Sequence, residues 1–175
     1  MKNHKVPEER REWIAVLVKT SLLLCIALIF QLGLAPFAQP LVGPAVNMVL
    51  LLAVLLLGNG PALLIGFSTP LIAFAVGIMP VVLVVPIIML GNALFILSFS
   101  FLYKRTHRFA ALLVAALAKT GIMAVTIRLF AYLFLPNLPP RIISALSLPQ
   151  LYTALMGGFL ALLVYRYLPH NRIEK

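Results

Sequence analysis

Long apolar segments dominate this sequence and leave few folds open to it. A helix needs about 20 apolar residues to cross the hydrocarbon core of a membrane. None of the segments alternates polar and apolar residues as the strands of a membrane barrel do. Six segments can be marked, at about residues 14–34, 41–57, 62–79, 81–103, 109–135 and 148–168. The sequence therefore predicts an all-α integral membrane protein with six transmembrane helices.

The composition favours a membrane environment over a soluble one. Hydrophobic residues make up 63% of the chain and charged residues 10%, whereas a soluble domain is about half apolar and about 25% charged. A core of this size cannot bury the excess, so most apolar side chains are expected to face lipid. Because no polar stretch is long enough for a soluble domain, residues 1–175 are expected to form a single transmembrane domain.

The basic residues predict how these helices are oriented. Lys and Arg collect in the N-terminal flank, in the connection at residues 104–108 and near the C-terminal end. Six crossings place all three regions on one side, and an excess of Lys and Arg marks the cytoplasmic side. Both termini are therefore expected in the cytoplasm. The same rule accounts for the net charge of +10 without a nucleic-acid partner.

The sequence lacks the groups that catalysis or ion coupling inside a membrane would use. The four acidic residues are Glu8, Glu9, Glu12 and Glu174, all in the terminal flanks. Ion-driven carriers commonly use an intramembrane carboxylate, and so does acid–base chemistry. There is also no Gly-rich phosphate-binding motif. We therefore expect a protein that is not an enzyme and that has no metal site and no cofactor.

Five polar side chains interrupt the apolar segments and are the candidate substrate contacts: Lys119, Asn92, Arg128, Asn47 and Gln150. An unpaired cation at mid-membrane costs at least ~2.5 kcal/mol. Lys119 lies about 15 Å into its segment, near mid-depth, and no acidic residue is there to pair with it. Arg128 lies near the outer interface and can extend towards it. Lys119 is therefore the stronger candidate for ligand binding.

The amides also have a structural interpretation. Asn47 and Asn92 can hydrogen-bond a neighbouring helix instead of a ligand. Gln150 follows Pro149 and can cap the start of its segment. Both interpretations remain open at the level of the sequence.

The two cations of the fifth segment are expected on different sides of its helix. Lys119 and Arg128 are nine positions apart. On a straight helix, their side chains therefore point to directions about half a turn apart. Arg128 then shares its side with Gly121, Ala124 and Ala131. Small residues are typical of helix contacts, so this side is expected to pack against another helix.

Four runs of the sequence resemble those of a known protein family: LVGPAVNMVLLLAVLLLGNGPALLIGFSTPLIAFAVGIMP, IMLGNALF, AALAKTGIMA and SLPQLYTALMGGFLALLV. In order and character they resemble the substrate-binding S components of energy-coupling factor (ECF) vitamin transporters, over Thr20 to Leu168. The resemblance implies binding of a vitamin or related micronutrient near the outer face of the bacterial cytoplasmic membrane. It also implies delivery by docking on a transmembrane coupling subunit driven by two cytoplasmic ATPases.

The resemblance further implies a docking surface on the first helix. The family typically offers small residues there, four positions apart. The nearest matches here are Ser21 and Cys25, together with Ala27, and these are the expected partner-binding residues. The alternative is a structural multi-spanning protein of the MreD cell-shape type, in which the buried polar residues join helices and no small molecule binds.

Overall fold

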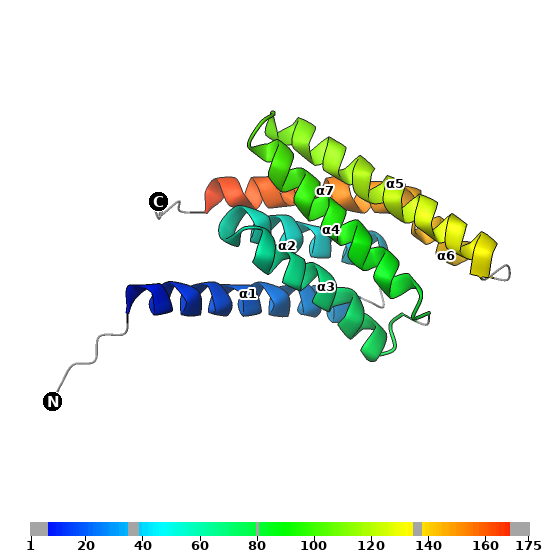
Figure 1. The fold of residues 1–175 in the computed structure, drawn as a ribbon, viewed down its shortest axis with the longest axis horizontal. Helices are drawn as coiled ribbons and strands as arrows, with labels where there is room; N and C mark the ends of the chain where they lie inside the picture. The colour runs from blue at the N-terminus through cyan, green and yellow to red at the C-terminus, as the bar shows by residue number, and fades with distance from the viewer. Residues whose placement is uncertain (1–6, 35–38, 80, 135–137, 169–175) are drawn as a thin grey trace.

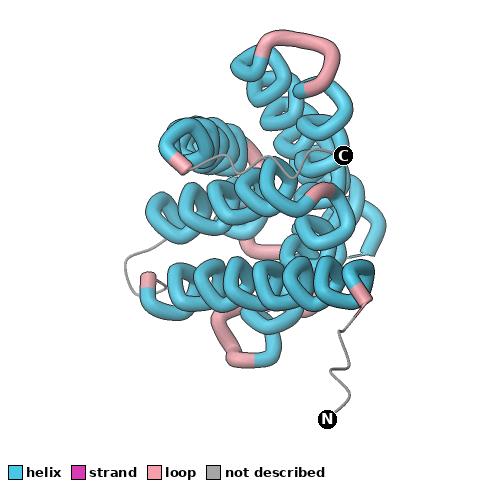
Figure 2. Tube along the Cα trace, turned by 90° about the vertical axis from the view of Figure 1, so that its left-hand side faces the viewer, coloured by secondary structure: helices cyan, strands magenta, loops and turns pink. Residues whose placement is uncertain are grey.

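The computed structural model describes residues 7–34, 39–79, 81–134 and 138–168. Within them every regular element is a helix (Figure 2), which confirms the all-α prediction. The helices are α1 (Glu8–Gly33), α2 (Gln39–Leu57), α3 (Asn59–Ala75), α4 (Val84–Tyr103), α5 (Arg108–Phe134), α6 (Pro140–Ala145) and α7 (Leu148–Tyr167).

Four helical stretches are long and apolar enough to cross a membrane. They are α1, α4, α5 and the stretch Pro140–Tyr167, which joins α6 and α7. The apolar parts of α2 and α3, Leu41–Leu57 and Asn59–Ala75, are shorter. By length and composition, the fold is therefore compatible with the membrane protein that the sequence predicts.

The first helix begins before its apolar part. It starts at Glu8, and Glu8 and Glu9 occupy its first turn. Carboxylates are favourable there because they interact with the partial positive charge of a helix N-terminus. The helix therefore begins before the apolar segment predicted at residues 14–34.

Helices α4 and α6 each have a proline in their first turn. Pro86 lies in the first turn of α4, where its missing N–H would have had no intrahelical partner. Pro140 opens the short helix α6, which lies between the apolar segments predicted at residues 109–135 and 148–168. A proline suits the first helical position because its φ is already helical.

The bundle is arranged around α2, which contacts α1, α3, α4 and α7. On the other side of the core, α5 packs against α4 and α7. The start of α1, the α4–α5 connection and the end of α7 lie at one end of the molecule, on the left in Figure 1. The α3–α4 connection and α6 lie at the opposite end.

Glycines allow the closest helix approaches. A Cβ added at Gly157 of α7 would meet the carbonyl oxygen of Pro44, and would lie 2.7 Å from Asn47 Cβ and 2.8 Å from Met48 N. A Cβ added at Gly91 of α4 would meet the side chain of Met123 of α5. These contacts hold α2 against α7 and α4 against α5, and thereby bring polar residues of different helices together.

We predict that Gly157→Ala destabilises the protein, because the added methyl group meets the backbone of α2 and the two helices must separate. Overpacking of this kind costs about 1–3 kcal/mol. The matched control is Gly121→Ala, whose added Cβ would meet no heavy atom within 4 Å and which gains up to about 1 kcal/mol of helix propensity. Apparent unfolding temperatures in detergent test this. Equal temperatures for the two variants would contradict the α2–α7 packing.

Candidate functional site

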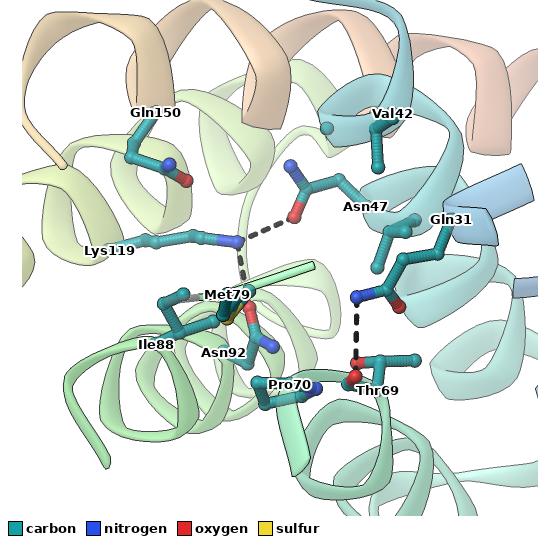
Figure 3. A pocket seen from close by; sticks show the side chains of 12 residues that line it. Gln31, Val42, Asn47, Thr69, Pro70, Met79, Ile88, Asn92, Lys119 and Gln150 are labelled. Carbon is teal, nitrogen blue, oxygen red and sulfur yellow. Dashed lines mark hydrogen bonds between the residues drawn. The ribbon is translucent and has the colours of Figure 1, made fainter. Parts of the chain in front are cut away.

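A small polar cavity lies between the helices, with a volume of about 80 Å³. It has room for several water molecules or a polar group of a few heavy atoms. Pockets that hold whole drug-sized ligands are larger, about 300–1,000 Å³. Figure 3 shows the cavity from close by; its polar lining consists of Gln31, Asn47, Thr69, Asn92, Lys119 and Gln150.

Lys119 is the charged residue of this lining. Its side chain extends from α5 and is only 3% exposed. Its Nζ donates hydrogen bonds to Asn47 Oδ1 at 2.6 Å and to Asn92 Oδ1 at 2.8 Å (Figure 3). The Nζ also lies 5.2 Å from the centroid of the Phe95 ring, within the range of a cation–π contact. Two amide dipoles and an aromatic ring therefore stabilise the charge.

The orientation of Asn92 follows from a proline in the neighbouring helix. Pro70 lies inside α3 and has no N–H to donate to the carbonyl of Gly66, four residues earlier. Asn92 Nδ2 donates to that carbonyl at 2.8 Å. Because the amide nitrogen is committed to Gly66, the amide oxygen must face Lys119.

A second chain of hydrogen bonds orients Asn47. Its Nδ2 donates to Thr153 Oγ1 at 3.4 Å, and Thr153 Oγ1 donates to the carbonyl of Gln150 at 3.2 Å. An ammonium group can only donate, so Asn47 must also present its oxygen to Lys119. Both chains run from donor to acceptor away from the lysine, which is the arrangement that a protonated Lys119 requires.

The site compensates this charge without a carboxylate. Glu8, Glu9 and Glu12 lie near the start of α1, and Glu174 lies outside the described residues. An ammonium group has three N–H donors, and two of them are used. The third has no hydrogen-bond partner among the described residues. The site can therefore donate a hydrogen bond to an oxygen of an anionic or carbonyl group.

Two further cavity residues were missed in the sequence analysis. Gln31 Nε2 donates to the carbonyl of Thr69 at 3.2 Å. Gln31 gave the same signal as Asn47, an amide inside an apolar segment, and could have been found. Thr69 gave none, because a threonine in a helix commonly bonds to its own backbone.

The structure separates Arg128 from the other candidates. Arg128 is exposed and does not line the cavity; its Nη1 donates to the carbonyl of Ala124 in its own helix at 2.8 Å. Gly121 is also exposed and has no neighbouring atom within 4 Å of an added Cβ. The expectation that this side of α5 packs against another helix is therefore wrong at Gly121.

Gln150 combines two roles that the sequence left as alternatives. Its side chain lines the cavity, and its Nε2 donates to the carbonyl of Ala145 at 3.1 Å. Ala145 is the last residue of α6. Gln150 therefore joins the first turn of α7 to the end of α6 at the edge of the cavity.

The expected partner-binding residues lie on two different sides of α1. Ser21 and Cys25 are exposed, whereas Ala27 is fully buried against the core. Ala27 therefore does not lie on the outer surface of α1, and its expected role as a partner contact needs correction. Ala27 is small because α1 packs against the bundle there.

Groups of three or more His, Cys, Asp or Glu side chains that could hold a metal ion do not occur among the described residues. The donors of the cavity are amide, hydroxyl and ammonium groups, which suit an organic ligand better than a metal ion.

Comparisons with known proteins do not identify this chain. No family model matches it, and neither a curated protein nor a solved structure shows significant similarity to it.

We predict that Asn92 and Lys119 are energetically coupled. Asn92→Leu should lower the free energy of unfolding by about 1.5–3 kcal/mol, because a buried ammonium loses an acceptor. In a Lys119→Met background, the same change should lower the free energy of unfolding by a smaller amount, with a difference of about 1 kcal/mol or more. Only the Gly66 carbonyl loses a partner in that background. A double-mutant cycle on unfolding in detergent measures the difference. Additive effects would show that the hydrogen bond contributes little.

Proposed function

We propose that this chain is the substrate-binding S component of an ECF-type importer and that it binds a vitamin or related micronutrient. The observation that carries the proposal is the buried ammonium of Lys119, which has one free donor in a polar cavity and no carboxylate partner in the described residues. A ligand oxygen at this donor would complete the hydrogen bonds of the lysine.

A ligand explains the lysine better than a structural role does. Leaving a charge buried with incomplete pairing costs several kcal/mol, and a purely structural contact between α2, α4 and α5 could be made by apolar residues without that cost. The cavity beside the ammonium adds further polar groups from α1, α3 and α7. Convergent polar groups of this kind are typical of a binding site.

The lack of an energy source supports dependence on partners. The sequence has no phosphate-binding motif and no intramembrane carboxylate, and the family resemblance implies that a transmembrane coupling subunit and two cytoplasmic ATPases drive uptake. The outer side of α1 offers an apolar surface for such docking, where large side chains such as Trp13, Leu17 and Leu22 are exposed beside Ser21 and Cys25.

We place the ligand site near the outer face of the cytoplasmic membrane, in a six-span arrangement with both termini inside. The cavity is lined by the last turn of α1 and by early turns of α2, α4 and α7. It therefore lies towards the end opposite the basic α4–α5 connection, which contains Lys104, Arg105 and Arg108. The positive-inside rule assigns that connection to the cytoplasm.

We predict the labelling pattern of single cysteines on a Cys25→Ser background. An impermeant thiol reagent applied to intact cells should label Ser144→Cys in α6 and should not label Thr106→Cys in the α4–α5 connection. Both positions are exposed, so they differ mainly in the side of the membrane. Labelling at position 106 from outside, with none at position 144, would invert the proposed topology.

We also predict that binding depends on Lys119 more than on Arg128. Lys119→Met removes the donor and should weaken binding of the co-purifying ligand at least ~10-fold, about 1.4 kcal/mol, while the folded protein remains soluble in detergent. Arg128→Met removes the same charge from the same helix outside the cavity and should change the affinity much less. Calorimetric titration measures both affinities. Unchanged affinity in Lys119→Met, together with lower thermal stability, would indicate a structural lysine.

A further inference from the structure

Two buried polar atoms of the cavity have no hydrogen-bond partner among the described residues. They are Gln31 Oε1 and Thr69 Oγ1. Both residues line the same cavity as Lys119 (Figure 3). Buried polar atoms are nearly always hydrogen-bonded in folded proteins, so these two atoms are candidate contacts of a bound molecule or an ordered water.

The chemistry of the Gln31 position is determined by its neighbour. The carbonyl of Thr69 can only accept, and the Gln31 nitrogen donates to it. The unpaired atom facing away from this bond must therefore be the amide oxygen, which can only accept. The Thr69 hydroxyl can both donate and accept, so it does not discriminate between ligands.

The lining of the cavity therefore contains both a donor and an acceptor. Lys119 has a spare N–H, and Gln31 has a free oxygen. We infer that the ligand enters the cavity with a head group in which a carbonyl oxygen stands beside an N–H, as in a carboxamide, lactam or ureide. The inference rests on the proposed function only in taking Lys119 as a ligand contact.

A simple carboxylate fits this arrangement less well. A carboxylate oxygen would accept a hydrogen bond from Lys119. However, a carboxylate has no hydrogen to donate to Gln31 Oε1, so this buried acceptor would stay unpaired. An unpaired buried acceptor costs about 1–3 kcal/mol. A head group with both functions satisfies both positions, while the amide oxygens of Asn47 and Asn92 still accept from Lys119.

The body of the ligand has a place next to the head group. A second cavity of about 170 Å³ lies between α6 and the start of α4, and Met79 and Ile88 line both cavities. Its lining is mainly apolar, with Arg141 as its charged residue. The polar cavity alone is too small for a cofactor-sized molecule, so the ligand is expected to pass between Met79 and Ile88.

The test uses three small probes on the full chain in detergent: acetamide, acetate and N,N-dimethylacetamide. Acetamide presents a carbonyl and an N–H, whereas the other two present acceptors without a donor. The unfolding temperature is followed as each probe is titrated. Shifts are measured relative to the Lys119→Met variant, which cancels general solvent effects.

The inference predicts that acetamide stabilises the wild-type protein with an affinity about 5-fold or more above that of the other probes, as expected for one additional hydrogen bond. Gln31→Met should abolish this preference. Thr69→Val, which keeps the Thr69 carbonyl, should retain it. The wild-type comparison decides the matter even if Gln31→Met does not fold.

Two negative results have different meanings. If acetate or N,N-dimethylacetamide stabilises the wild-type protein as well as acetamide does, the head-group inference is wrong, while a ligand at Lys119 and the proposed function stand. If no probe stabilises the wild-type protein more than Lys119→Met, both the inference and the ligand role of Lys119 are overturned.

Discussion

The structure depends on one buried charge and the way it is compensated. The ammonium of Lys119 in α5 is bonded to Asn47 of α2 and Asn92 of α4. Each amide is held in place by a further acceptor, Asn92 by the Gly66 carbonyl and Asn47 by Thr153. Five helices are thereby linked through one hydrogen-bond network, whose centre is a cation with a donor still free.

This network and the backbone support each other. The proline in α3 frees the carbonyl of Gly66, and Asn92 satisfies that carbonyl instead of leaving it unpaired in an apolar environment. Irregular backbone at membrane depth is tolerated where protein covers it. Gly157 allows α7 to approach α2 beside Asn47. The same close contacts that stabilise the bundle therefore also position the polar side chains of the cavity.

The sequence predicts the helical class and much of the polar lining, for clear physical reasons. Apolar segments of this length indicate helices, and a lysine without an acidic partner indicates a special environment. The pairing of Asn47 and Asn92 with Lys119 could not be predicted, because it depends on helix rotations set by glycine contacts far apart in the chain. The burial of Ala27 could not be predicted either, because the small size of a residue does not reveal which side of a helix is buried. The sequence did not predict the short helix α6, because prolines disfavour the interior of a helix.

The proposed function rests on one contact, in which a ligand completes the hydrogen bonds of the buried Lys119. An experimental structure of the protein in a lipid nanodisc, purified with the small molecule that accompanies it, tests this most directly. The account predicts a ligand oxygen about 2.7–2.9 Å from Lys119 Nζ, the distance of a charge-assisted hydrogen bond, with the Asn47 and Asn92 contacts retained. A ligand bound elsewhere, with the third donor of Lys119 bonded to a protein carbonyl, would contradict it.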